Sequence, residues 1–254
     1  NCPRCGFKHW IKTGRINRDE IPYWKCGRCG KVSIGDYPFI REPVKELYLD
    51  IETSYTDIIG NFGLKVRGEY IRAKMIRHPF YIICWSALWT DKPDKIYSGC
   101  VTQEDALKFS DKNILAPLWD LMNRADRIAG HNVASFDAKK IETRFKINGF
   151  TPPLPYKTVD TLKIARERYS FESNTLDYLC TLFGLPNKDK MYDDDWIAIA
   201  EHGCPKALRK MKKYNRGDVR NGAAILEILR DVPAEYGMRI FKNEPKDKRD
   251  KATD

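Results

Sequence analysis

The segment ELYLD at residues 46–50 constrains the fold more than any other feature, because it ends an apolar run on a carboxylate. The following residues continue the pattern, with Ile51 standing between Asp50 and Glu52. Side chains alternate between the two faces of a strand, so both carboxylates point to the same side. An unpaired carboxylate in a buried strand is costly unless it binds a metal ion or hydrogen-bond donors. We therefore predict that Asp50 and Glu52 share an ion, and the alternative is a solvated entry into a turn.

The rest of the chain predicts an antiparallel meander followed by strands that alternate with helices. Residues 81–89 and 95–101 are rich in aromatic and β-branched side chains, and the turn-like DKPD at 91–94 separates them. Asn174 is the expected N-cap of one later helix, which Gly184 closes. Apolar periodicity and stop signals predict short strands at 127–129 and 156–159, and helices at 113–125, 136–147, 160–169, 174–183, 194–201 and 205–230.

Length and composition fit a folded chain with one α/β domain and a small module. The 254 residues are 42% hydrophobic. The longest strongly apolar stretch, 80–89, is well short of the roughly 20 residues that a membrane-spanning helix needs. The N-terminus has no signal-peptide pattern, so we expect an intracellular, cytoplasmic protein without membrane partners. A net charge of +10 favours polyanionic partners, although solubility alone also explains such a charge.

Three acidic motifs resemble those of the DEDD, or DnaQ-like, superfamily of 3′–5′ exonucleases. LYLDIET at 47–53 is similar to the first exonuclease motif, GHNVASFD at 130–137 to the second, and YNRGD at 214–218 to the third. The resemblance covers roughly residues 44–232. It is closest to the ribonuclease H-like predicted exonucleases and extends to the proofreading domains of family B polymerases. It implies an α/β, ribonuclease H-like fold with a mixed sheet flanked by helices, in an exonuclease domain at 44–236.

The resemblance also implies roles for the motif residues. Asp50, Glu52 and Asp218 would bind a first Mg²⁺ or Mn²⁺ ion, Asp50 would be shared with a second ion, and Asp137 would support that second ion. Two such ions activate a water and stabilise charge on the attacking and leaving oxygens of a phosphodiester. Tyr214 precedes Asp218 by four residues, so the two side chains face the same side of a helix. This spacing resembles the DEDDy subclass, which implies that Tyr214 orients the attacking water.

The implied reaction is hydrolysis of single-stranded nucleic acid from its 3′ end to nucleoside 5′-monophosphates, with DNA favoured over RNA. The alternatives are a 3′–5′ exoribonuclease and a catalytically silent nucleic-acid-binding module of the same fold. Asn132 could instead cap the following helix, Phe136 could belong to the core, and the residues after Glu52 could simply end the strand. The candidates for contacts with the terminal nucleotide are Thr53, Ser54, His131, Asn132 and Phe136.

Two Cys-x-x-Cys pairs, Cys2 with Cys5 and Cys26 with Cys29, predict a zinc ribbon at residues 1–40. A closed Cys₄ site is structural, and its Zn²⁺ would supply folding energy that a short, weakly apolar segment lacks. A thioredoxin-like redox motif would need a βαβ context, which this segment does not have. The basic and aromatic residues between the pairs could bind nucleic acid or pack the ribbon. At the other end of the chain, residues 237–254 are rich in mixed charge and are expected to form a flexible tail.

Overall fold

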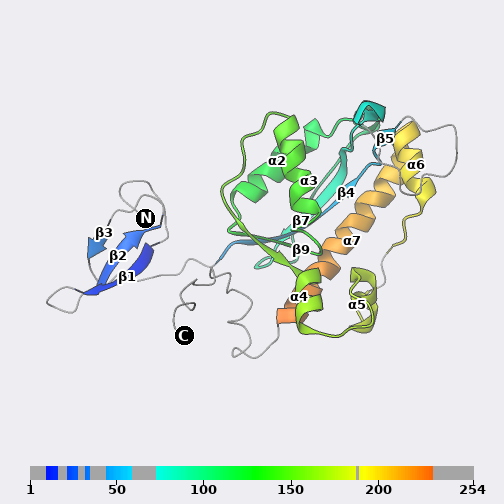
Figure 1. Ribbon diagram of the computed structural model, residues 1–254. Helices are drawn as coiled ribbons and strands as arrows, with labels where there is room; N and C mark the ends of the chain where they lie inside the picture. The colour runs from blue at the N-terminus through cyan, green and yellow to red at the C-terminus, as the bar shows by residue number, and fades with distance from the viewer. Residues whose placement is uncertain are drawn as a thin grey trace, which may run out of the picture. The chain divides into compact units, whose positions relative to one another are not determined.

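The computed structural model describes residues 10–16, 22–27, 32–34, 44–58, 73–186 and 189–230. The chain divides into two compact units, Asn1–Pro43 and Val44–Asp254. In the first unit, β1 (Trp10–Ile16), β2 (Pro22–Cys26) and β3 (Val32–Ile34) form an antiparallel sheet in that order (Figure 1). Cys26 is buried at the end of β2. The other predicted zinc ligands, Cys2, Cys5 and Cys29, lie outside the described residues, as does the predicted tail at 237–254.

The second unit is built on a five-stranded mixed sheet in the order β10-β9-β4-β7-β8. β4 pairs antiparallel with β7, and β7 pairs antiparallel with β8, which confirms the predicted meander. β9 and β10 extend the other edge of β4 as parallel strands. The bounds of these strands are β4 (Glu46–Thr53), β7 (Ile82–Trp89), β8 (Ile96–Cys100), β9 (Arg127–Gly130) and β10 (Lys157–Asp160).

Helices cover both faces of this sheet (Figure 1). α2 and α3 lie on one face, and the long helix α7 crosses the other together with α4 and α5. The mixed sheet with flanking helices is compatible with the expected ribonuclease H-like fold. The helix bounds are α1 (Gln103–Leu107), α2 (Lys112–Asn123), α3 (Asp137–Ile147), α4 (Thr161–Arg168), α5 (Leu176–Leu182), α6 (Asp193–His202) and α7 (Pro205–Arg230).

Some local predictions need correction. The N-cap of α5 is Thr175, whose side chain accepts the backbone N–H of Tyr178, and not the preceding Asn174. The short elements α1, β5 (Asp57–Ile58), η1 (Ala73–Met75) and β6 (Ile76–His78) were not predicted, because segments of two to five residues are too short to show a periodic pattern. β5 and β6 pair with each other outside the main sheet.

The side chains of β4 alternate between the two faces of the sheet. Leu47, Leu49 and Ile51 belong to the core that also contains side chains of α2 and α3. Tyr48 belongs to the core beneath α4, α5 and α7. Because alternation continues to the end of the strand, the acidic side chains at positions 50 and 52 share the α7 face with Tyr48.

Helix α7 presents a continuous buried stripe to the sheet. Two members of this stripe, Asn215 and Asp218, are polar, which is costly in a buried position unless their groups find partners. Their place in the stripe puts both of them over the sheet. The stripe follows the spacing of three or four residues that is typical of one helix face, and consists of Leu208, Met211, Asn215, Asp218, Gly222, Leu226 and Leu229.

Helix α3 is fixed to its neighbours by a buried ion pair. Arg144 Nε and Nη2 donate to the two carboxylate oxygens of Asp111 over 2.6 and 2.8 Å. The same carboxylate accepts the backbone N–H of Ile82 in β7 over 2.9 Å. Bidentate pairs of this kind are both strong and directional. The pair therefore fixes the position of α3, and with it the position of the residues at the helix start.

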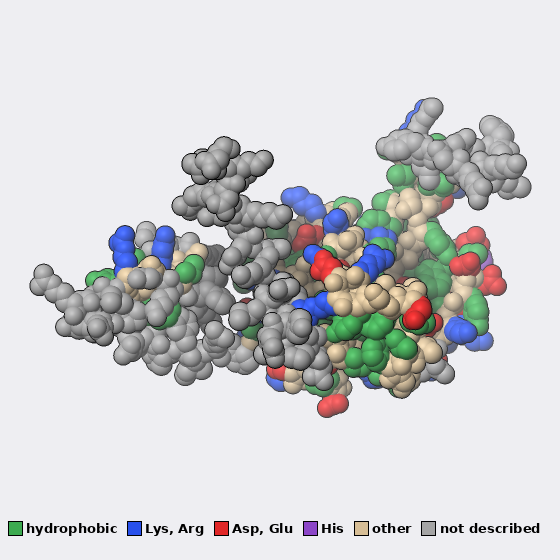
Figure 2. All heavy atoms as spheres, turned by 60° about the horizontal axis from the view of Figure 1, so that its bottom comes forward, with side chains coloured by type: hydrophobic (Ala, Val, Ile, Leu, Met, Phe, Trp, Pro, Cys, Tyr) green, Lys and Arg blue, Asp and Glu red, His purple; other side chains and the backbone are tan. Residues whose placement is uncertain are grey.

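The surface seen from the side of α4 and α5 carries a group of hydrophobic side chains over α5 (Figure 2). Leu182 and Phe183 at the end of this helix are exposed. No helix among the described residues is long and apolar enough to cross a membrane.

Candidate active site

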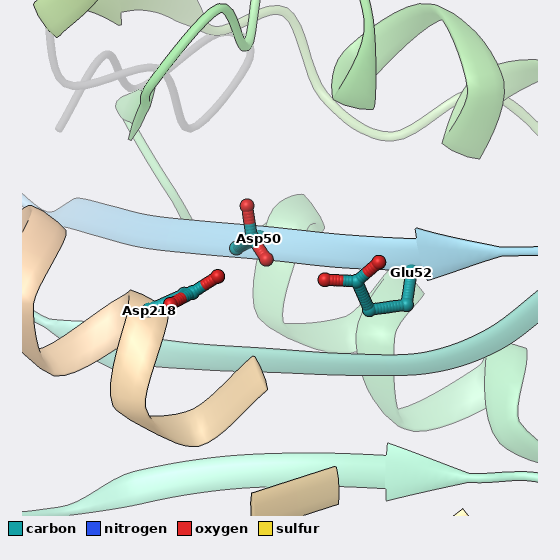
Figure 3. A group of neighbouring side chains, drawn as sticks. All are labelled: Asp50, Glu52 and Asp218. Atoms are coloured by element: carbon teal, nitrogen blue, oxygen red, sulfur yellow. The ribbon is translucent and has the colours of Figure 1, made fainter. Parts of the chain in front are cut away.

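Two carboxylates of β4 and one of α7, a helix distant in sequence, converge in the structure (Figure 3). Each of Asp50, Glu52 and Asp218 offers one oxygen, and these oxygens all lie within 4.8 Å of one another. Asp218 is buried, and the other two are half-buried. Like charges this close repel one another unless a proton or a cation lies between them. Hard divalent cations prefer carboxylate oxygens, so the cluster has the donors that Mg²⁺ or Mn²⁺ binds.

The local structure explains this convergence. Period-two alternation places Asp50 and Glu52 on the same face of β4, as the sequence predicted. The buried stripe of α7 places Asp218 against that face. The helix comes this close because position 222, one turn further on, is glycine: a Cβ there would lie 2.0 Å from the hydroxyl oxygen of Tyr48. A strand and a helix that are far apart in sequence are thereby held in contact at the site.

Asn215 is a member of the site that the sequence analysis missed. Its side-chain Nδ2 donates to Asp50 Oδ2 over 2.7 Å, and the residue is fully buried. A donor on one oxygen of a metal-binding carboxylate fixes the orientation of the other oxygen. The available signal was its position three residues before Asp218, which puts both side chains on one helix face.

Tyr214 lies one turn before Asp218 on α7 and is half-buried. Burial, together with the charges of Asp218 and Glu52, raises the pKa of Tyr214 above its usual value. Its phenol therefore stays protonated near neutral pH and is a hydrogen-bond donor beside the carboxylates. This position matches the spacing from which the sequence analysis selected it.

Asp137 approaches β4 from the opposite side to α7. It is the first residue of α3 and is almost fully buried, and its Oδ1 accepts the backbone N–H of Ile51 over 3.1 Å. Burial raises the pKa of Asp137 to about 7, although the hydrogen bond from Ile51 favours the charged form. Asp137 is not one of the three residues whose oxygens lie within 4.8 Å of one another. Its hydrogen bond places it at the edge of β4, on the backbone of the residue between Asp50 and Glu52.

The turn at 131–136 carries the chain from β9 to α3 and is held by Asp160. The backbone N–H groups of Asn132 and Ala134 donate to the two oxygens of Asp160 over 2.9 and 3.2 Å. Asp160 also caps α4, where its side chain accepts the backbone N–H groups of Leu162 and Lys163. Asn132 has a left-handed φ of 70°, which asparagine tolerates better than most residues. The alternative that Asn132 caps α3 is wrong, because the N-cap residue of α3 is Phe136.

Two side chains that were predicted to contact the substrate form hydrogen bonds within the protein. The ring nitrogens of His131 lie 2.9 Å from Thr161 Oγ1 and 2.9 Å from the carbonyl oxygen of Asn174. Ser54 is buried, and its Oγ accepts the backbone N–H of Tyr81 over 3.0 Å. These bonds give both side chains a structural role at the ends of β4 and β9. Their contact with a nucleotide stays a prediction.

Thr53 and Phe136 both contact Lys140, a residue that was not predicted from the sequence. Lys140 Nζ donates to Thr53 Oγ1 over 2.8 Å and lies 4.4 Å from the centre of the Phe136 ring. Phe136 is 39% exposed, so the alternative that it belongs to the core is wrong. Its exposure comes from its place before the first turn of α3, where the ring projects from the turn rather than from the buried helix face.

Comparisons with known proteins support the fold. No protein-family model matches the sequence. Protein NEN2 of Arabidopsis thaliana is 35% identical over 95 residues, which are 36% of this chain and 19% of the plant protein. A solved structure, the family B DNA polymerase from the hyperthermophilic archaeon Pyrobaculum calidifontis, is similar with a TM-score of 0.55 and 17% identity. That match covers 87% of this chain and 28% of the polymerase chain.

The chain thus spans less than a third of the length of either protein. At 17% identity, the similarity to the polymerase demonstrates a shared fold. One fold can carry many functions, so the function of this chain depends on its own residues.

Proposed function

We propose that this chain is a divalent-metal-dependent 3′–5′ exonuclease of the DEDDy type, acting on single-stranded nucleic acid and favouring DNA over RNA. The observation that carries the proposal is the meeting of Asp50, Glu52 and Asp218 within 4.8 Å, from a strand and a helix far apart in sequence. The fold similarity to a family B DNA polymerase supports it, because the sequence motifs independently resemble the proofreading domains of such polymerases.

In this proposal each site residue has a defined task. Asp50, Glu52 and Asp218 would hold one Mg²⁺ or Mn²⁺ ion, and Asp50 and Asp137 would help to hold a second. The bound ions would supply an activated water and would stabilise charge on the attacking and leaving oxygens. Tyr214, kept protonated by its raised pKa, donates a hydrogen bond that orients the attacking water. The products are nucleoside 5′-monophosphates.

Residues 44–236 would form this exonuclease domain, and residues 1–40 would bind one structural Zn²⁺ through Cys2, Cys5, Cys26 and Cys29. The burial of Cys26 at the end of a strand in a small antiparallel sheet supports the zinc site. Such a site is closed to substrate, so it would stabilise its own unit rather than take part in hydrolysis.

The test is the shortening of 5′-labelled single-stranded DNA and RNA of the same sequence with Mg²⁺ or Mn²⁺. We expect a ladder of products that grows from the 3′ end, with DNA degraded faster than RNA. Asp218→Asn should abolish the ladder. Asp120→Asn, which makes the same change on the exposed side of α2, should leave it intact.

Each other outcome has a clear meaning. A single internal cut would contradict an exonuclease. Faster shortening of RNA would make the chain an exoribonuclease. Binding without cleavage under every metal condition would identify a catalytically silent nucleic-acid-binding module.

A further inference from the structure

Lys140 contacts the end of β4, the strand that carries two of the three carboxylates. It lies on α3, one turn after Asp137, and is half-buried. Its ammonium donates to the hydroxyl of Thr53 over 2.8 Å. Thr53 is the last residue of β4 and directly follows Glu52. The ammonium therefore lies at the end of the strand that supplies two of the acidic side chains.

Two aromatic rings enclose this ammonium. The centres of the Phe80 and Phe136 rings lie 4.6 and 4.4 Å from Lys140 Nζ. Contacts of a cation with ring faces at such distances are attractive. Because Phe136 is 39% exposed, the group is open to solvent on its side. A molecule that approaches the carboxylates from that side would meet a ring and a positive charge together.

The charge of Lys140 has no anionic partner within the described ranges of the chain. Its contacts there are one hydroxyl and two rings. Burial lowers the pKa of Lys140, and the nearby charge of Asp137 opposes that effect. Lysine is rarely withdrawn from water without a paired anion. An ammonium has three donors, and the Thr53 hydroxyl takes only one of them, so there is capacity for an anion.

We propose that Lys140 is a substrate-binding residue that contacts a phosphate group of the nucleic-acid strand next to the carboxylates, while Phe136 stacks on an adjacent base. The inference rests on the proposed function, because a nucleic-acid strand is the ligand that brings both groups to this site. Grooves that bind single strands combine positive side chains along the backbone with aromatic side chains that stack on bases. Lys140, Phe136 and Phe80 form such a combination over a few ångströms.

Three variants separate this role from a structural one. Lys140→Met keeps the aliphatic stem and removes the charge. Lys140→Arg restores the charge, and Thr53→Val removes the internal hydrogen bond while keeping the lysine. The matched control is Lys139→Met, which makes the same change at the neighbouring exposed position of α3.

The measurement is the affinity of each variant for a short 5′-fluorescein-labelled oligothymidylate by fluorescence anisotropy, over a range of salt concentrations. Ca²⁺ replaces Mg²⁺ in these titrations, and the length of the oligonucleotide is checked on a gel afterwards. We expect Lys140→Met to bind about tenfold more weakly, as is typical for the loss of a charge-assisted hydrogen bond. The slope of log affinity against log salt should fall by about 0.7, the value for one phosphate contact on a single strand.

The salt slopes of Lys140→Arg, Thr53→Val and Lys139→Met should equal that of the wild type. An unchanged salt slope in Lys140→Met would overturn the inference, and so would an equal reduction in Lys139→Met. If the wild type hydrolyses the oligonucleotide but Lys140→Met keeps the wild-type salt slope, the role of Lys140 is rejected and the proposed exonuclease activity stands. If the wild type binds the oligonucleotide but does not hydrolyse it with Mg²⁺ or Mn²⁺, the proposed exonuclease activity alone is rejected. If the wild type does not bind it, both the activity and the role of Lys140 are rejected.

Discussion

Replacing Asn215 by leucine should weaken metal binding far more than it destabilises the fold. Asn215 Nδ2 donates to Asp50 Oδ2 over 2.7 Å from the buried stripe of α7. Leucine has a similar size and removes this donor. Asp50 would then lose the hydrogen bond that holds its carboxylate in orientation toward Glu52 and Asp218.

Asn215→Leu changes the free energy of unfolding in two opposite ways. The lost hydrogen bond to a charged group contributes about 1.5–3 kcal/mol. Asn215 Oδ1, however, is buried without a hydrogen-bond partner among the described residues, which is itself a cost of about 1–3 kcal/mol that leucine removes. The two terms nearly cancel, so Asn215→Leu should change stability by less than about 1 kcal/mol. The loss of a partner that orients a metal ligand typically weakens metal affinity by about 10–100-fold.

Two measurements on the same protein samples test this prediction. Urea unfolding in EDTA gives the change in stability, and a Mn²⁺ titration by calorimetry gives the change in affinity. The matched control is Asn221→Leu, a buried asparagine on the same helix whose Nδ2 donates to the backbone oxygen of Pro186 over 3.0 Å. It should lower stability and leave Mn²⁺ affinity unchanged. Equal Mn²⁺ affinities for Asn215→Leu and the wild type would refute the orienting role of Asn215.

Other predictions follow from single features of the structure. Tyr214→Phe should lower the turnover number by a factor on the order of 10² with little change in oligonucleotide affinity, and retained turnover would contradict its role. Gly222→Ala should destabilise the fold in urea by about 1–3 kcal/mol, because the new Cβ would lie 2.0 Å from the Tyr48 hydroxyl oxygen. Apart from its chain neighbours and its own helix backbone, a Cβ at Gly217 on the same helix would meet no heavy atom of the described residues within 4 Å. Gly217→Ala should therefore stabilise the fold by about 0.5–1 kcal/mol, and the reverse order of the two variants would refute the packing argument. Elemental analysis should find one zinc per wild-type chain and none in Cys26→Ser, whereas a zinc-free wild type would contradict the ribbon.

The features that were predicted well from the sequence are those that follow from the regular repeat of side chains along a strand or a helix. Alternation along β4 predicted that Asp50 and Glu52 share a face, and they do. A helical pattern at 205–230 predicted the bounds of α7. Within that helix, the spacing of four residues predicted that Tyr214 and Asp218 lie on the same side. These results depend only on the local geometry of a strand and a helix, which the order of residues determines.

The missed residues have roles that depend on which surfaces meet. Lys140 is a polar residue in a helix with many polar residues, so nothing local distinguishes it from a solvent-exposed one, and for Asn215 the local signal was only its spacing from Asp218. Their roles depend on the contacts of α7 and α3 with the two sides of β4. His131 and Ser54 illustrate the converse case. Each stands next to a motif, yet the tertiary structure supplies its polar atoms with protein partners.

The unequal lengths of two neighbouring strands explain how residues from both faces of the sheet reach the same place. β9 ends at Gly130, and its pairing with β4 ends where Ala129 faces Tyr48. β4 continues to Thr53, and no strand in the described part of the chain pairs with its last residues on that side, where Asp137 accepts the N–H of Ile51. Crevices beyond the carboxyl ends of parallel strands are common ligand sites for this reason. A longer β9 would pair with this edge of β4 and occupy the N–H of Ile51, so the early end of β9 is what lets Asp137 bind the backbone between Asp50 and Glu52.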